Sequence, residues 1–175
     1  MKTPLVPLLF FCSGATALVY EVIWSRYLGL MFGSTIQAQT VVMAVFMGGL
    51  ALGNRLFGRR SDHLLQPLAA YGYLEIAIGL YAFFFHQWYG WMDRAFVAVG
   101  SGLVDRSGAL LLLKGALAVG LLLVPTVLMG GTLPLLAAWL QRSSAEPGRW
   151  SATFYAVNSL GAVAGSFLAG LILIR

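Results

Sequence analysis

The amino-acid sequence predicts an all-α protein, a polytopic membrane helix bundle of about five spans that forms a single domain over residues 1–175. The first reason is composition, since 59% of the residues are hydrophobic and only 10% are charged, whereas soluble domains carry about 25% charged residues. The second reason is arrangement. The apolar residues stand in long blocks between short polar segments, and a membrane-spanning helix needs about 20 apolar residues. Backbone groups in lipid must be satisfied within the segment, so the spans should be helices.

The first two predicted spans cover residues 5–32 and 38–56. A polar turn at Gly33 separates them, and a basic segment follows the second span. Gly49 and Gly53 stand four residues apart in the second span, a spacing that allows a neighbouring helix to approach closely.

The third predicted span covers residues 67–85 and begins at Pro67, a residue favoured in the first turn of a helix. Trp88 and Trp91 then mark a membrane interface, where amphipathic rings accumulate. Residues 92–107 contain charged residues and several glycines. We expect an exposed loop there, or a loop that includes a short interfacial helix.

The fourth predicted segment, residues 108–140, is too long for one straight span. It contains four helix-breaking residues, Pro125, Gly130, Gly131 and Pro134. The pattern predicts either one kinked, tilted helix or a broken helix with unwound backbone. A loop over residues 141–149 precedes the last span, residues 154–174, in which Gly161 and Gly165 again have the close-packing spacing.

The distribution of basic residues predicts the orientation, because cytoplasmic loops carry an excess of Lys and Arg. One end of the predicted bundle collects Lys2, Arg55, Arg59, Arg60, Arg142 and Arg149, and the other collects Arg94, Arg106 and Arg175. We expect a cell inner (plasma) membrane protein with a cytoplasmic N-terminus and an external C-terminus. The net charge of +5 is explained by these loops, so no nucleic-acid partner is predicted.

Charged side chains within a bilayer are costly and are candidates for function. Glu21 is predicted to lie roughly 21 Å from the inner surface, and Lys114 to lie roughly 9 Å below the outer surface of a ~30 Å core. Because these depths are similar, we expect the two side chains to form an ion pair. That pair could serve substrate binding, or it could only hold helices together.

Glu75 is predicted to lie roughly 12 Å from the cytoplasmic surface. It has no obvious partner at that depth unless Arg59 or Arg60 reaches it, and a lone buried carboxyl should be protonated or bind a cation. Asn158 is a further candidate for substrate binding, although a hydrogen bond between helices is the more common role of such a residue.

Several kinds of chemistry lack a basis in the sequence. Only two histidines and one cysteine are present, and His63 and His86 are expected at opposite membrane surfaces, so neither a metal nor a cofactor is predicted. No phosphate-binding loop or nucleophile–base arrangement stands out. The chain by itself is therefore not expected to be an enzyme.

The chain also carries a series of short motifs, and together they resemble the membrane part of spermidine-synthase-like proteins. The motifs are Ser13-Gly14-Ala15, Tyr20-Glu21-Val22 with Trp24 and Arg26, Phe32-Gly33-Ser34-Thr35, Phe46-Met47, Gly49-Leu50-Ala51-Leu52-Gly53, Leu74-Glu75 with Ile78-Gly79-Leu80-Tyr81, Pro125-Thr126 with Leu128-Met129-Gly130-Gly131-Thr132-Leu133-Pro134, and Tyr155-Ala156-Val157-Asn158-Ser159-Leu160-Gly161-Ala162. In that family a multi-pass membrane region is commonly joined to a soluble aminopropyltransferase-like domain. The resemblance implies a membrane half alone, because no residues here match that domain or its catalytic positions.

A second likeness concerns the segment Gly58-Arg59-Arg60-Ser61-Asp62-His63. It is similar to the loop between the second and third helices of major-facilitator transporters, where acidic and basic residues help to gate the two halves. The likeness ends after His63. A basic loop that only sets topology is an equal alternative for Arg59, Arg60 and Asp62.

Two functions follow as expectations. The first is an anchoring or accessory subunit of a larger membrane complex, because the helices have small-residue faces suited to packing against something else. The second is a transporter or half-transporter for a small cationic solute such as a polyamine, favoured by Glu21, Glu75 and the interrupted fourth segment. The expected partners are membrane lipid and either another protein or a second copy of the chain.

Overall fold

The computed structural model describes residues 5–33, 35–103 and 106–173 and contains no strand within them. The α-helices are α1 (Leu5–Phe32), α2 (Thr35–Ser61), α3 (Pro67–Phe83), α4 (Phe85–Gly100), α5 (Ser107–Ser143) and α6 (Pro147–Leu168). A short 3₁₀ turn, η1 (Ser101–Leu103), follows α4, and a π-helical turn, η2 (Ala169–Leu173), continues α6. The prediction of an all-α bundle is confirmed.

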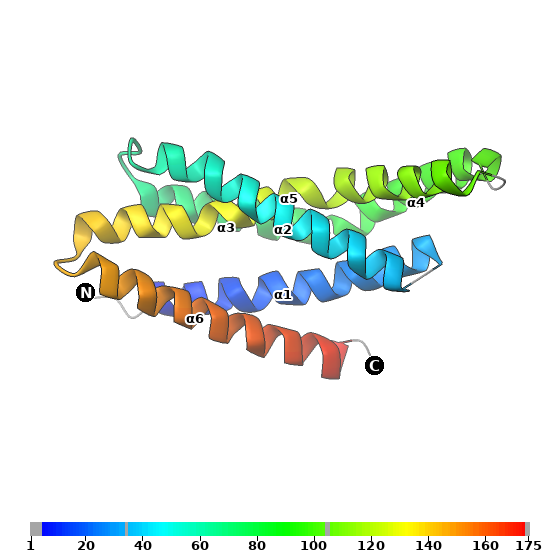
Figure 1. Ribbon diagram of the computed structural model, residues 1–175. Coiled ribbons are helices and arrows are strands. Elements are labelled where there is room, and N and C mark those ends of the chain that lie inside the picture. Colours follow the sequence, from blue (N-terminus) through cyan, green and yellow to red (C-terminus); the bar gives the residue numbers. More distant parts are fainter. Residues whose placement is uncertain (1–4, 34, 104–105, 174–175) are drawn as a thin grey trace.

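The helices lie roughly along one common direction and alternate in their sense (Figure 1). The start of α1 and the connections α2–α3 and α5–α6 lie at one end of the bundle, whereas the α1–α2 and α4–α5 connections and the end of α6 lie at the other (Figure 1). Helix α4 continues onward from α3, and α5 returns along both. The described residues therefore pass along the bundle five times.

Four helical segments are long and apolar enough to cross a membrane, and they correspond to α1, α2, α5 and α6 with its π-helical continuation. Helices α3 and α4 meet the same criteria only as a pair, which is bent by 54° at the break between them. A bend of this kind is consistent with a broken span or with a re-entrant loop. The described residues thus contain four candidate spans, or five when the bent pair counts as one.

The alternative of a loop without a helix over residues 92–107 is wrong, because α4 extends to Gly100. Phe85 is buried, and Tyr89, Met92 and Phe96 follow it at helical spacing and pack against the core. Glycines and charged residues suggested a loop, yet they occupy the other positions of an amphipathic helix. Its apolar period of three to four residues is the signal that favours this helix.

The alternative of a broken fourth segment is also wrong, since α5 is continuous over 37 residues with Pro125 and Pro134 inside it. Proline has no N–H, so Pro125 leaves the carbonyl of Leu121 without its helical partner. The hydroxyl of Tyr81 on α3 donates a hydrogen bond to that carbonyl. Thr126 donates to the Leu122 carbonyl at 2.7 Å. A polar side chain from a neighbouring helix thus satisfies the backbone group that proline leaves unpaired.

Glycine contacts fix two pairs of helices, α2 with α5 and α1 with α6. A Cβ atom at Gly49 would overlap Thr126. A Cβ atom at Gly161 or at Gly165 would overlap a backbone carbonyl of α1, that of Phe11 or that of Ala15. The close packing predicted from the spacing of these glycines is confirmed. Other helices of the same chain cover these glycines, so the spacing of the glycines no longer indicates a separate partner.

The buried core has two parts along the bundle. One part surrounds Trp24, which stacks on Phe85 with ring centroids 5.2 Å apart. The other surrounds Phe10, whose ring contacts those of Tyr71 and Phe154. Helices α1 and α3 contribute to both parts, and two of the candidate residues, Glu21 and Glu75, lie on these helices.

Candidate functional site

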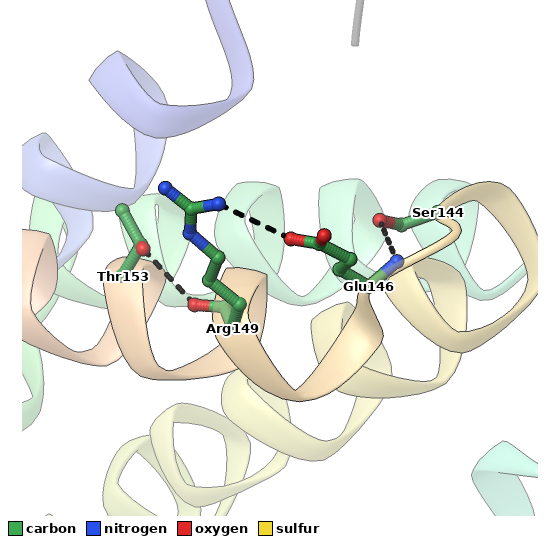
Figure 2. Close-up of polar contacts among 4 residues, drawn as sticks. All are labelled: Ser144, Glu146, Arg149 and Thr153. Carbon is green, nitrogen blue, oxygen red and sulfur yellow. Dashed lines mark hydrogen bonds and ion pairs between the residues drawn. The ribbon is translucent and has the colours of Figure 1, made fainter.

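Glu75 lies on α3, two turns after Pro67, and its carboxyl points toward α1. The hydroxyl of Ser13 donates a hydrogen bond to Oε1 of Glu75 at 2.6 Å. No basic side chain forms an ion pair with Glu75 within the described part of the chain, because the ion pair found there joins Arg149 to Glu146 at 3.3 Å. Figure 2 shows that pair at the exposed start of α6. The alternative in which Arg59 or Arg60 reaches Glu75 is not realised among the described residues.

A cavity of about 460 Å³ adjoins Glu75 between α1 and α3. Its polar lining from α1 is Cys12, Ser13, Thr16 and Tyr20, and from α3 it is Tyr71 and Glu75. Apolar side chains and glycines complete the lining. A mostly apolar cavity with a few converging polar groups is the usual form of a small-molecule site.

Tyr71 precedes Glu75 by one helical turn and is only 4% exposed. Its hydroxyl lies beside Glu75 and Ser13, yet it makes no hydrogen bond of ordinary geometry with any residue that the structure describes. A buried hydroxyl without a partner is costly in an apolar interior. The cavity therefore has an available donor and acceptor beside its carboxylate.

The predicted ion pair between Glu21 and Lys114 is wrong. The ammonium of Lys114 donates to the backbone carbonyl of Phe32 at 2.6 Å and lies 5.6 Å from the centroid of its ring. Phe32 is the last residue of α1, and the last carbonyls of a helix lack intrahelical partners and attract cations. Similar depth placed Glu21 and Lys114 at the same level, but depth does not determine which way each side chain faces.

Glu21 lines a different cavity, of about 550 Å³, between α1 and α2. Ser25, Arg26 and Gln39 supply its other polar groups, and the Ser25 hydroxyl donates to Oε1 of Gln39 at 3.2 Å. Tyr20 faces the Glu75 cavity while Glu21 faces this one. Helix α1 therefore presents polar groups on two faces.

Asn158 lines a third cavity, of about 330 Å³, with Asn54 and Thr132. Its side chain makes no hydrogen bond to the described residues, and its backbone carbonyl contacts Gly14 of α1. Lys114 lines yet another depression, near Ser107. The four predicted binding residues thus lie in four separate places, and whether any of them binds a substrate stays a prediction.

Arg59 and Arg60 lie in the last turn of α2 rather than in the loop predicted for them. The connection that follows α2 is held to the end of α5. Arg142 donates to the backbone carbonyl of Asp62 at 2.7 Å and also to that of Leu64. Arg59 and Arg60 are exposed and form no ion pair within the described chain. Their proposed part in gating or topology stays a prediction. Arg142, named from the sequence only as one of the basic residues that predict the orientation, also binds the connection after α2.

Sequence reasoning missed the role of Ser13 and Tyr71 beside Glu75. A signal was present, because Ser13, Thr16 and Tyr20 recur at the spacing of one helix face, and Tyr71 precedes Glu75 by four residues. The described residues hold no group of three or more His, Cys, Asp or Glu side chains placed to bind a metal.

No protein-family model, no curated protein and no solved structure matches this chain. The likeness to spermidine-synthase-like membrane regions therefore stays a prediction.

Proposed function

We propose that this chain is a membrane-embedded binding module for a small cationic solute, such as a polyamine, and that it acts as half of a transporter. The observation that carries the proposal is the Glu75 carboxyl, which adjoins a cavity and has no basic partner in the described chain. A carboxylate in an apolar environment is costly without a compensating charge. An ammonium group in the cavity would supply that charge.

The chemistry of the lining suits a primary ammonium group on an alkyl chain. Such a group has three N–H donors, and Glu75, Ser13 and Tyr71, which all line the cavity, offer oxygen acceptors. Tyr20 adds an aromatic ring, which can attract a cation through its face. The apolar lining would accommodate the methylene groups of the solute.

Transport would require more than one chain. Alternating access commonly works by rocking one repeat or bundle against another around a central site, and the described residues make five passes along the bundle. We propose that two copies, or one copy and a partner, form the complete transporter.

The proposed orientation places the start of α1 in the cytoplasm of a plasma membrane. The α2–α3 and α5–α6 connections lie at that end (Figure 1), and Arg55, Arg59, Arg60, Arg142 and Arg149 stand near it. An excess of Lys and Arg favours the cytoplasmic side. Glu75 would then lie about 12 Å from the cytoplasmic surface.

The single cysteine provides the test. Cys12 is exposed and lines the Glu75 cavity, so its reaction with the neutral reagent N-ethylmaleimide reports whether the cavity is occupied. We expect spermidine to slow the labelling of the purified wild-type protein and to have no effect on the Glu75→Gln variant. The Cys12→Ala variant should not be labelled, which controls for other reactive groups.

Uptake of labelled spermidine into proteoliposomes then tests transport itself. Uptake by the wild type that Glu75→Gln abolishes would support the proposal. Protection of Cys12 or uptake that survives Glu75→Gln would show that the assigned role of Glu75 is wrong.

A second candidate function is an anchoring or accessory subunit, and one observation favours it. Helix α4 and the first part of α5 extend past the ends of α1, α2 and α6 (Figure 1), and this extension exposes apolar side chains such as Val97 (62%) and Leu112 (77%). Gentle extraction from native membranes, followed by mass determination, separates the candidates. A second protein in fixed ratio would favour the subunit role, whereas a homo-oligomer would favour transport.

A further inference from the structure

The cavity between α1 and α2 contains two opposite charges that do not neutralise each other. Glu21 is half-buried and Arg26 is exposed, and both line the same space of about 550 Å³. Neither forms an ion pair or a side-chain hydrogen bond with any residue that the structure describes. They stand five positions apart along α1, which corresponds to an axial distance of about 7.5 Å.

We propose that this cavity binds a zwitterion, a molecule that carries an ammonium group together with a phosphate or carboxylate. Glu21 would bind the ammonium group, and Arg26 would bind the anionic group, for which a guanidinium is well suited. Ser25 and Gln39 supply further polar contacts, and apolar walls formed by Leu18, Val22 and Leu30 border the rest of the molecule.

The pairing of charges is what distinguishes this site from the Glu75 cavity. A simple cation near Glu21 would be repelled by Arg26, and a simple anion near Arg26 would be repelled by Glu21. A molecule with both charges can contact both side chains at once. The inference rests on this cavity alone and does not depend on the function proposed for Glu75.

Two sources can supply the same chemistry. Leu30 at the edge of the cavity is 72% exposed, so the cavity opens toward the side of the bundle, where a lipid with an ethanolamine phosphate headgroup could enter. A soluble zwitterion could enter from the water phase near Arg26. Phosphoethanolamine represents the soluble source, and nanodiscs that contain phosphatidylethanolamine represent the lipid.

The first experiment measures the binding of phosphoethanolamine to the full chain in a maltoside detergent by microscale thermophoresis. We expect Glu21→Gln and Arg26→Gln each to weaken binding about tenfold or more, since each removes a charge-assisted contact. The binding of ethanolamine alone or of inorganic phosphate alone to this cavity in the wild-type protein should be at least as weak as the binding of phosphoethanolamine to these two variants. Arg94→Gln removes a charge from an exposed position on α4 that does not line this cavity. It is the matched control and should bind phosphoethanolamine like the wild type.

The second experiment tests the lipid source. It compares the melting temperature of the protein in nanodiscs of phosphatidylethanolamine with that in nanodiscs of phosphatidylglycerol, which lacks the ammonium group. A stabilisation that both Glu21→Gln and Arg26→Gln remove, without binding of the soluble probe, supports the proposal with a lipid as the ligand. Circular dichroism of each variant verifies folding, and Arg26→Lys, which keeps the charge, should retain part of the binding. The proposal is overturned if neither source binds, or if both neutral variants bind like the wild type.

Discussion

Among single residues, Tyr81 and Pro125 form an interaction whose energy can be isolated. Tyr81 donates to the Leu121 carbonyl that Pro125 leaves unpaired. We expect Tyr81→Phe to reduce the free energy of unfolding by about 1 kcal/mol, a typical value for a hydrogen bond between membrane helices. In a Pro125→Ala background the backbone N–H of Ala bonds to Leu121, so the same change should cost much less. Unfolding in mixed micelles measures this double-mutant cycle, and an equal cost in both backgrounds would contradict the interpretation.

Tyr71 and Ser13 give a contrasting pair beside Glu75. Because the Tyr71 hydroxyl has no partner of ordinary geometry in the described chain, Tyr71→Phe should leave the unfolding free energy unchanged or raise it slightly. Ser13→Ala removes the hydrogen bond to Glu75 and should lower that free energy by about 1 kcal/mol.

The protection of Cys12 by spermidine should weaken about tenfold in Tyr71→Phe, as expected for a lost hydrogen bond to a charged group. Protection that is unchanged would remove Tyr71 from the proposed site.

Among the helices, the neighbours Gly48 and Gly49 provide a matched comparison on α2. A Cβ atom at Gly49 would overlap Thr126 of α5, whereas a Cβ atom at Gly48 would meet nothing within 4 Å. We expect Gly49→Ala to lower the unfolding free energy by about 1–3 kcal/mol through overpacking. Gly48→Ala should be neutral or stabilising by up to about 1 kcal/mol, because alanine favours helix more than glycine does. Equal effects of the two changes would show that α2 and α5 do not pack as described.

The same helices show what could be predicted from the sequence and what could not. Hydropathy indicates which segments are apolar enough to cross a membrane, so the segments that correspond to α1, α2, α5 and α6 could be predicted. It does not determine how each helix is rotated or which helix lies beside it. Lys114 therefore reaches Phe32 rather than Glu21, and Ser13 of α1 was not recognised as the partner of Glu75. Neighbours are determined by side-chain shape, as at the glycine crossings, and a single sequence gives only the spacing of those residues.

For the whole molecule, the main question is how often the chain crosses the membrane. Helix α5 has 37 residues, which corresponds to about 55 Å and exceeds a ~30 Å hydrocarbon core. Helix α5 must then be tilted, or one of its ends must project beyond the core. The part of α4 that contacts α5 would project with it. The bent α3–α4 pair is either a broken span or a re-entrant loop, and these alternatives place the α4–α5 connection on opposite sides.

Cysteine labelling in intact cells distinguishes these alternatives. In a Cys12→Ala background, which removes the only native cysteine, a single cysteine replaces either His63 or Ser101, both of which are exposed. A membrane-impermeant maleimide should label Ser101→Cys and not His63→Cys, because the proposed orientation places the α2–α3 connection in the cytoplasm. Labelling of His63→Cys alone would reverse the orientation. If both positions are labelled, or if both are protected, the chain crosses the membrane an even number of times between them. The bent pair would then be re-entrant, and the described chain would have four spans. Labelling of both after the cells are permeabilised confirms that each cysteine is reactive.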